Sequence, residues 1–167
     1  MIYTSHYQSP IGGITLASNG AELTGLWFDG QKYFGDTLPK EYKEKELPVF
    51  EEAKCWLDMY FRGNEPDFTP PICVDATPFR KEVWEILLTI PYGKTMTYKE
   101  IAEKFAKERG IVKMSAQAVG GAVGHNPISL IIPCHRVVGT NGSLTGYAGG
   151  IDKKEWLLAL ERGSVFQ

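Results

Sequence analysis

A cysteine followed by histidine and arginine carries the clearest chemical signal in the sequence. Cys134, His135 and Arg136 stand in the run Pro-Cys-His-Arg-Val at residues 133–137, directly after an apolar stretch. Basic or cationic neighbours lower the pKa of a thiol, and the thiolate is the nucleophilic form of cysteine. The pattern therefore predicts that Cys134 is a nucleophile, with a buried and inert cysteine as the alternative. Arg136 is expected to be a structural ion-pair partner, with a phosphate contact as the alternative.

Other chemistries fit this cysteine less well. The other histidines, His6 and His125, show no ligand spacing, and the chain has no Cys-x-x-Cys pair, so no metal site is predicted. If Cys134 lies on a strand, its neighbour His135 points to the opposite face, which disfavours a direct pair but allows a bridging water. A cysteine hydrolase would also need a separate base and an oxyanion arrangement, and we find neither in the sequence.

Two short helices with helix-turn-helix spacing precede the cysteine, at residues 98–107 and 115–124. Thr97 and Glu100 predict a capping box at the start of the first helix. The second helix consists almost entirely of small residues with adjacent glycines, although each interior glycine costs roughly 1 kcal/mol relative to alanine. We expect its backbone to approach another surface closely, either a neighbouring helix or a nucleic-acid groove.

This second helix offers little for reading a base sequence. Gln117 is its only long polar side chain, whereas direct readout needs several such groups. If the helix binds DNA, it should therefore do so with little sequence preference. Lys107, Arg109 and Lys113 flank it as candidate phosphate contacts, and free N–H groups at Ser115 would add an anion site.

The composition is that of one or two small globular domains. Of the 167 residues, 43% are hydrophobic and 23% are charged. Residues 1–76 carry 6 Lys and Arg against 12 Asp and Glu, whereas residues 77–167 carry 12 against 8. The basic second half favours a polyanionic partner, with an ordinary solvated surface as the alternative. Prolines concentrate in residues 64–78, so we place a domain boundary near residue 76.

Hydrophobic periodicity predicts the remaining elements. Strands are expected at 14–17 and 23–28 around a hairpin turn at 18–20, with Asn-Gly supplying positive φ values, and a charged loop at 36–48. Helices are expected at 49–61, 78–90 and 152–161, and short strands at 130–132 and 137–138. Trp84 and Trp156 stand at core spacing.

The cysteine count predicts a reduced chain. Three cysteines without a paired motif do not suggest a disulfide framework. Cys55 falls in the helix at 49–61 and is expected to be buried, and Cys73 is expected to be structural. No signal peptide or membrane-spanning stretch is visible, which favours a cytoplasmic protein without membrane contact.

Residues 133–137 resemble the active-site motif of the O6-alkylguanine-DNA alkyltransferases, also called methylated-DNA–protein-cysteine methyltransferases. The resemblance extends from about residue 77 to 161 in matching order, through the runs 91–93, 97–98, 118–122, 126–127, 147–150 and 154–158. Residues 1–76 resemble the family only in broad pattern. The implied fold is α+β with two small domains. Residues 1–76 would form a ribonuclease-H-like α/β domain, and residues 77–167 a mainly α domain with a winged-helix-like helix-turn-helix.

The resemblance implies direct reversal of DNA damage. Such a protein moves a methyl or other alkyl group from O6-alkylguanine, and from O4-alkylthymine, to its own cysteine after flipping the base out of the duplex. The carbon–sulfur bond is stable, so one molecule repairs one lesion. The resemblance implies no cofactor and no metal. The expected partner is double-stranded DNA, bound as a monomer through the minor groove without sequence preference.

Catalytic roles carry over from the family residue by residue. Cys134 matches the acceptor, His135 the base that takes the thiol proton through a water, and Glu161 the acid that orients the histidine. The carboxylate is expected to raise the basicity of the imidazole. The other matches are Tyr98, which supports proton delivery to guanine N3, Lys154, near the same site, and Asn126, which ties the recognition helix to the cysteine segment.

The resemblance also implies two binding surfaces. The DNA-binding residues are expected to be Thr97, Lys113, Ser115, Gln117, Ala118 and Gly121. The substrate pocket is expected to be shaped by Ser129, Val138, Tyr147, Ala148 and Gly149, the last three from the glycine-rich run at 143–150. That run is no phosphate-binding loop, because no Gly-Lys-Ser/Thr follows it.

The chain departs from the family at one position. The family places an arginine on the second helix to fill the gap left by the flipped base, whereas this chain has Gln117. We expect flipping to be retained with weaker support. Two alternatives of other classes are a non-enzymatic alkyltransferase-like protein that binds lesions, which would lack the acceptor cysteine, and a helix-turn-helix regulator, which would need base-reading side chains.

Overall fold

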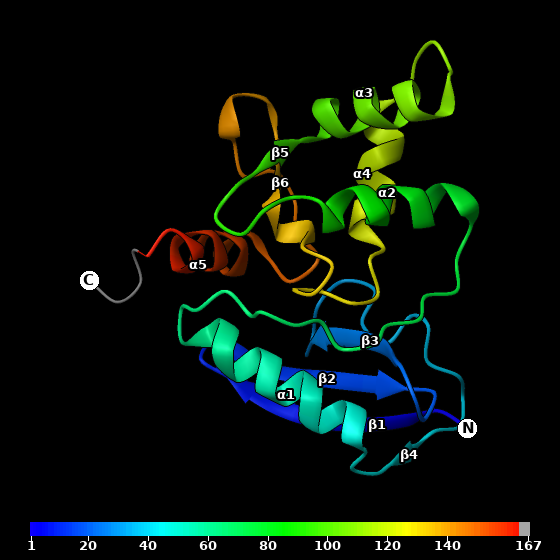
Figure 1. The fold of residues 1–167 in the computed structure, drawn as a ribbon, viewed down its shortest axis with the longest axis vertical. Helices are drawn as coiled ribbons and strands as arrows, with labels where there is room; N and C mark the ends of the chain where they lie inside the picture. The colour runs from blue at the N-terminus through cyan, green and yellow to red at the C-terminus, as the bar shows by residue number, and fades with distance from the viewer. Residues whose placement is uncertain (164–167) are drawn as a thin grey trace.

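The computed structural model describes residues 1–163, which form a sheet-containing N-terminal unit and a mainly helical C-terminal unit (Figure 1). In the N-terminal unit, the helix α1 (Pro48–Phe61) packs on a sheet of strand order β3-β2-β1-β4. The strands are β1 (Tyr3–Ser9), β2 (Gly12–Ser18), β3 (Leu23–Phe28) and β4 (Lys43–Glu44). The first three are antiparallel neighbours, and β4 runs parallel to β1.

The predicted hairpin at residues 18–20 is present between β2 and β3, with a modified turn. Gly20 takes a positive φ of 109°, but Asn19 does not. The Asn19 side chain instead accepts hydrogen bonds from the backbone N–H groups of Ala21 and Glu22, which satisfies the turn locally. The turn is therefore longer than a two-residue Asn-Gly turn.

In the C-terminal unit, four helices surround a two-stranded parallel ladder (Figure 1). The helices are α2 (Pro78–Leu88), α3 (Tyr98–Arg109), α4 (Ala116–Gly124) and α5 (Ile151–Glu161). The ladder pairs β5 (Met96–Thr97) with β6 (Val137–Val138), and short 3-10 turns lie at η1 (Cys134–Arg136) and η2 (Thr140–Gly142). The capping box between Thr97 and Glu100 forms as predicted. The predicted packing role of Trp84 is confirmed, since its indole N–H donates to the Ala122 carbonyl at 2.8 Å.

Three local predictions are wrong. The charged run at 36–48 is not all loop, because residues 43–44 form β4 beside β1. Residues 130–132 form no strand: Leu130 adopts a positive φ of 71°, and tight turns follow, so the chain reverses instead of extending. Cys55 is exposed. It lies two residues beyond the buried Ala53, a rotation of about 200° around the helix, which takes it away from the sheet. Cys73 is exposed as well, although its N–H pairs with the Leu23 carbonyl.

The two units are joined along the edge of β3. Leu23 exchanges backbone hydrogen bonds with the segment at 71–73, and Leu26 does so with Pro127 and Ser129 at 2.8 and 2.9 Å. This pairing covers a sheet edge that would otherwise expose unpaired backbone groups. The N-terminal sheet is therefore fixed against the segment that leads into Cys134.

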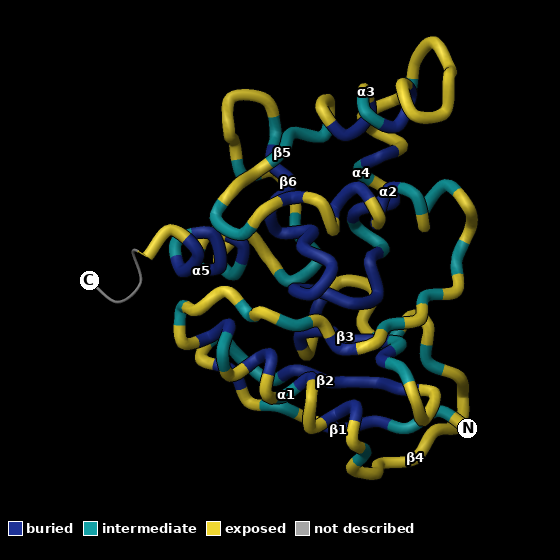
Figure 2. The backbone as a smooth tube through the Cα atoms, in the orientation of Figure 1, coloured by how far each residue is buried: buried dark blue, intermediate teal, exposed yellow. Residues whose placement is uncertain are grey.

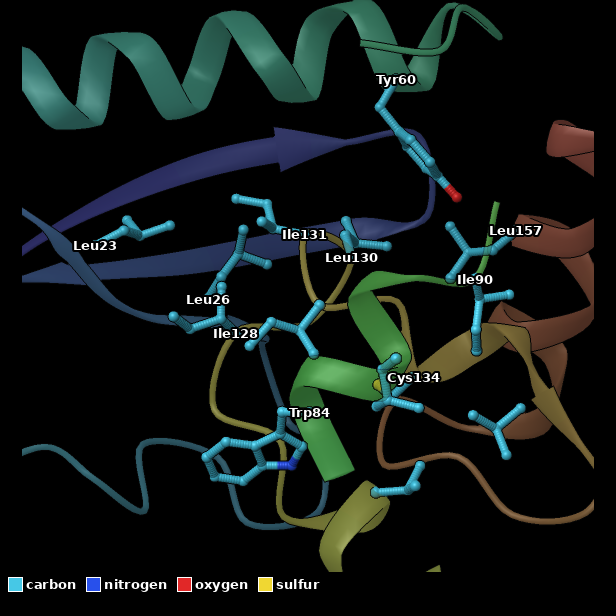
Figure 3. Close-up of a cluster of buried hydrophobic side chains, with 14 of the residues drawn as sticks. Leu23, Leu26, Tyr60, Trp84, Ile90, Ile128, Leu130, Ile131, Cys134 and Leu157 are labelled. Carbon is cyan, nitrogen blue, oxygen red and sulfur yellow. The ribbon is translucent and has the colours of Figure 1, made fainter. Parts of the chain in front are cut away.

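Apolar side chains from both units form one buried cluster. Figure 2 shows buried backbone in the sheet and in the turns at the centre of the C-terminal unit. Figure 3 shows Leu26 and Ile128 facing each other, with Trp84, Leu130 and Cys134 in the same cluster. Within residues 1–163, no helix is long and apolar enough to cross a membrane.

Candidate active site

Cys134 is held by a compact loop that Asn126 fastens. The Asn126 side-chain amide donates to the Ile132 carbonyl at 2.7 Å, and its oxygen accepts from the Ile128 N–H at 3.0 Å. Asn126 therefore links the end of α4 to both halves of the turn before the cysteine. Cys134 begins η1 and is 5% exposed, so the residue is almost completely removed from solvent.

A buried acid–base pair stands beside this cysteine. His135 Nε2 lies 2.5 Å from Glu161 Oε2, and both side chains are fully buried. A carboxylate only accepts at this distance, so Nε2 carries the proton. His135 Nδ1 is then the atom with a free lone pair, and it has no hydrogen-bond partner among the described residues. The arrangement leaves a basic nitrogen available for a proton.

Arg136 completes the pairing of Glu161. Its Nε donates to Glu161 Oε1 at 2.8 Å, and its Nη1 donates to the Ile90 carbonyl at 2.8 Å. The Gly93 N–H donates to the same carboxylate oxygen, Oε1, at 2.9 Å. The prediction that Arg136 is a structural ion-pair partner is therefore confirmed. Since a buried charge is tolerated only when it is paired and hydrogen-bonded, Glu161 is held as an anion.

Burial sets the protonation states and overturns one expectation, that of a lowered thiol pKa at Cys134. Burial raises the pKa of the Cys134 thiol, and this outweighs the opposing effects of Asn126 and Lys154. Burial also lowers the pKa of His135, although Glu161 acts in the opposite direction. Burial alone would raise the pKa of Glu161, but His135 and Arg136 lower it to about 2. Near neutral pH the site therefore holds a neutral thiol, a neutral imidazole and a carboxylate.

Cys134 opens into a cavity of about 360 Å³. Its walls include five residues that the sequence singled out, namely Tyr98, Gly121, Cys134, Tyr147 and Ala148. Glycines of α4 and of the glycine-rich loop line it, so small residues keep the space open. Its volume falls within the range of small-molecule pockets.

Tyr98 and Lys154 meet at the loop that bounds this cavity. The Tyr98 hydroxyl donates to the Thr145 carbonyl at 3.1 Å, and Lys154 Nζ donates to the carbonyls of Thr145 and Gly146 at 3.3 and 3.0 Å. The ammonium lies 5.9 Å from the Tyr98 ring centre. Burial lowers the pKa of Lys154 to about 8. The charge of Lys154 is therefore poised to change in mildly alkaline solution.

Three residues expected to shape the pocket do not line the cavity. Ser129 is buried in the turn before the cysteine, and Val138 is buried in β6. A Cβ at Gly149 would come within 2.8 Å of the Tyr147 ring and 3.2 Å of the Phe28 ring. Gly149 is therefore needed for close packing beneath Tyr147.

The expected DNA-binding residues lie mainly on one exposed face around α4. The exposed members are Lys113, Ser115, Gln117, Ala118 and Gly121, and Thr97 is half-buried at its cap. The Ser115 hydroxyl accepts from the N–H groups of residues 117 and 118. The expectation of free N–H groups for an anion there is therefore wrong for those two groups, because the serine cap already satisfies them.

The sequence did not single out four residues of the site. The cavity wall also includes Lys32 and Tyr33 from the N-terminal unit, and His125, whose ring stacks on Tyr33 at 3.9 Å. Tyr60 from α1 donates to Glu161 Oε2 at 2.7 Å. Tyr60 stands at a core position of its helix, so periodicity alone assigns it to packing. One available signal was that a buried tyrosine hydroxyl needs a partner.

The fold and site define a two-domain protein with a buried cysteine at a cavity that is lined in part by the second helix of a helix-turn-helix. Residues 2–74 match the family model of the ribonuclease-like domain of 6-O-methylguanine DNA methyltransferase, and residues 78–163 match that of its DNA-binding domain. The chain therefore belongs to the 6-O-methylguanine DNA methyltransferase family. Within residues 1–163, His, Cys, Asp and Glu side chains nowhere gather in threes in a way that could hold a metal ion.

Relatives cover nearly the whole chain. The methylated-DNA–protein-cysteine methyltransferase of Methanosarcina barkeri is 44% identical over 98% of this chain and 99% of its own length. That of Haemophilus influenzae is 38% identical over 96% and 87%. The crystal structure of Mycobacterium tuberculosis OGT in complex with DNA is similar with a TM-score of 0.83 and 41% identity, covering 98% and 93%. These matches bear out the fold class and family inferred from the sequence.

Proposed function

We propose that this protein repairs alkylated DNA by direct reversal, transferring the alkyl group of O6-alkylguanine to Cys134 in a single turnover. The observation that carries the proposal is the placement of Cys134 at the cavity with a buried His135–Glu161 pair beside it. Family membership and relatives named methylated-DNA–protein-cysteine methyltransferases support the same chemistry. O4-alkylthymine is a second substrate under this proposal.

In the proposed reaction, Cys134 sulfur attacks the alkyl carbon. A sulfur–carbon bond forms, and the carbon–O6 bond breaks with its electron pair passing to the guanine. The thiol proton passes to His135 Nδ1 through a water, and Glu161 stabilises the resulting imidazolium. Tyr98 supports delivery of one proton to guanine N3, so the base leaves neutral, with Lys154 beside it. In net terms the thiol proton is exchanged for the alkyl group.

The neutral thiol of Cys134 explains why a base is needed. Because burial raises the pKa of the thiol, little thiolate exists before substrate enters. Because burial lowers the pKa of His135, its imidazole is neutral and free to accept that proton. An uncharged resting pair also limits reaction with other electrophiles. The proton therefore leaves as the alkyl group arrives.

The proposed partner is double-stranded DNA, bound by a monomer through the minor groove. The helix α4 presents the small residues Ala118 and Gly121 on an exposed face, with Gln117 as its one long polar side chain, which suits close approach without base readout. The lesion would leave the stack and enter the cavity between α4 and the glycine-rich loop. A DNA-binding domain model that matches this unit and a similar structure that holds DNA support this part.

Three further points belong to the proposal. The domains divide near residue 76, so that residues 77–167 carry DNA binding and transfer. The reaction needs no cofactor, because the acceptor is the protein's own thiol. The protein works in the cytoplasm, which is supported by three free cysteines in the described chain.

The deciding experiment is mass spectrometry after incubation with duplex DNA that contains O6-methylguanine. We expect one methyl adduct per protein, on Cys134, and none in Cys134→Ser. The exposed Cys55 and Cys73 serve as internal controls, because accessible thiols outside the cavity should stay unmodified. Tight lesion binding without an adduct would contradict the proposal and favour a non-enzymatic lesion-binding protein.

A further inference from the structure

One side chain of the N-terminal unit reaches the buried acid–base pair. Tyr60 comes from α1, and Figure 3 shows its hydroxyl pointing away from that helix. The hydroxyl donates to Glu161 Oε2 at 2.7 Å and lies 3.2 Å from His135 Nε2. The residue is completely buried. The hydroxyl is therefore in contact with both Glu161 Oε2 and His135 Nε2, the two atoms that fix the protonation state of the imidazole.

The Tyr60 ring is fixed by neighbours on several sides. Trp56 stacks on it with ring centroids 5.3 Å apart and planes at 5°. Tyr92 and His135 each meet it edge to face, with ring centroids 6.2 Å from that of Tyr60. Phe61 adds a further edge contact at 5.4 Å. Because these contacts restrict the ring, the hydroxyl is held in place without having to be ordered when substrate binds.

Glu161 Oε2 accepts hydrogen bonds from three side chains. His135 Nε2 and Tyr60 lie at 2.5 and 2.7 Å, and Arg136 Nη2 lies at 3.3 Å. Each donor restrains the orientation of the carboxylate, and each makes the carboxylate a weaker base. The acid therefore holds the Nε2 proton of His135 without removing it. His135 and Arg136 belong to the C-terminal unit, whereas Tyr60 is contributed by the N-terminal unit.

We infer that Tyr60 is a positioning residue for alkyl transfer, by which the N-terminal unit keeps Glu161 aimed at His135 Nε2 and so keeps His135 Nδ1 free as the base. The inference rests on the proposed function. Tyr60 is absent from the cavity wall and so touches no substrate there. Its effect passes through Glu161, which makes the sheet-containing unit part of the reaction and not only a support.

The test uses Tyr60→Phe in the full chain, which keeps the ring and removes one hydroxyl. We expect the rate constant at saturating lesion DNA to fall roughly 10- to 100-fold, the effect of one hydrogen bond to a charged group. Lesion-DNA affinity should not change. Without this donor the carboxylate holds the imidazolium more tightly, so the acidic limb of the pH–rate profile should move to higher pH.

Tyr92→Phe is a matched control. Its ring contacts Tyr60, and its hydroxyl is buried with no hydrogen-bond partner in the described part of the chain. It undergoes the same chemical deletion beside the same ring, and it should leave rate and pH profile unchanged. A role of Tyr60 in stability alone would lower the melting temperature without moving the acidic limb, and that result would overturn the inference.

A second measurement needs no variant. Nitrogen NMR of His135 in the wild-type protein should show Nε2 protonated and Nδ1 unprotonated near neutral pH, and the opposite tautomer would overturn the inference. An unchanged rate and pH profile in Tyr60→Phe would overturn it too. If wild-type protein forms no adduct on Cys134, the proposed function fails instead, so the two failures are distinguishable.

Discussion

The two sides of the cavity are built by opposite means. On the cysteine side, Glu161 is buried and receives hydrogen bonds from Tyr60, Gly93, His135 and Arg136. On the α4 side the surface is exposed and made of small residues, and its long polar side chain, Gln117, reaches into solvent. The first side is fixed by many mutual contacts, whereas the second is left free to meet another molecule.

This contrast separates chemistry from recognition. A buried network specifies the position and protonation of each member, because removal of one leaves another unpaired. The exposed α4 face carries few such dependencies, so its residues can be exchanged at little cost to folding. Changes on the cysteine side should therefore affect both stability and transfer, and changes on the α4 side should affect transfer from duplex DNA alone.

The largest expected effect is that of Glu161→Gln. The substitution removes the anion that orients His135 and pairs with Arg136. We expect the transfer rate to fall about 10²- to 10⁴-fold. The free energy of unfolding should fall by roughly 3–5 kcal/mol, because a buried cation is left unpaired. Glu155→Gln, an exposed acid on the same helix, is the control and should change neither quantity.

The acid stability of the protein tests the same group. Since the folded protein lowers the pKa of Glu161 to about 2, the unfolded chain binds its proton first as the pH falls. The stabilisation is complete above the ordinary value of 4.5 and is lost as the pH falls from there toward 2. Its size is on the order of 3 kcal/mol. Chemical denaturation across this range should show a shallower slope for Glu161→Gln.

Local patterns in the sequence predict much of this arrangement. Helix periodicity and capping residues placed α1 and α3 nearly to their ends, because Thr97 and Glu100 satisfy groups within one turn. The Cys-His-Arg run pointed to the segment whose Cys134 lines the cavity, because this signal also lies in neighbouring residues of the chain. The resemblance then linked it to Glu161, which is 26 positions further along the chain than His135.

Long-range packing explains what the sequence did not predict. Tyr60 meets Glu161 across 101 positions of the chain, and no local pattern reports such a contact. The run at 130–132 looked like a strand because it is apolar, but it is buried as a series of turns. The raised pKa of Cys134 depends on burial, which its basic neighbours in the sequence do not reveal.

A smaller effect is expected from Lys154, which lies on α5 and donates to carbonyls of the glycine-rich loop. Its pKa of about 8 means that its charge is lost in mildly alkaline solution. We expect Lys154→Met to lower the transfer rate roughly 10-fold at neutral pH, about the effect of one charge-assisted hydrogen bond. The wild-type rate should fall above pH 8, and the variant should lack that limb.

Stability gives an independent check on Lys154. Its folded pKa lies below the ordinary 10.5, so the unfolded chain binds more protons between about 8 and 10.5. Wild-type stability should gain a contribution from this group as the pH rises through that window, and Lys154→Met should lose it. Lys153→Met is the neighbouring control. Equal rate profiles for the wild-type protein and Lys154→Met would mean that the ammonium has no part in transfer.

The smallest expected effect comes from Gln117→Arg on the α4 side. The side chain is exposed and the helix is already capped by Ser115, so we expect no change in folding. A guanidinium can stack in the gap left by a flipped base and can pair with phosphates. We expect transfer from duplex DNA to become roughly 3- to 10-fold faster. The slope of log DNA affinity against log salt concentration should become steeper by about one, since about one more counterion is released on binding. Transfer from free O6-methylguanine should stay unchanged.

Gln117→Lys separates the two effects of that arginine, since it adds the same charge without a planar group. If filling the gap matters, Gln117→Lys should reproduce the steeper salt dependence but not the faster transfer. Equal acceleration by both variants would assign the gain to electrostatic attraction alone. Equal rates of transfer from duplex DNA for the wild-type protein and Gln117→Arg would show that this surface does not limit base flipping. The chemistry would then be limited by the buried side of the cavity, where Glu161 and Tyr60 set the base.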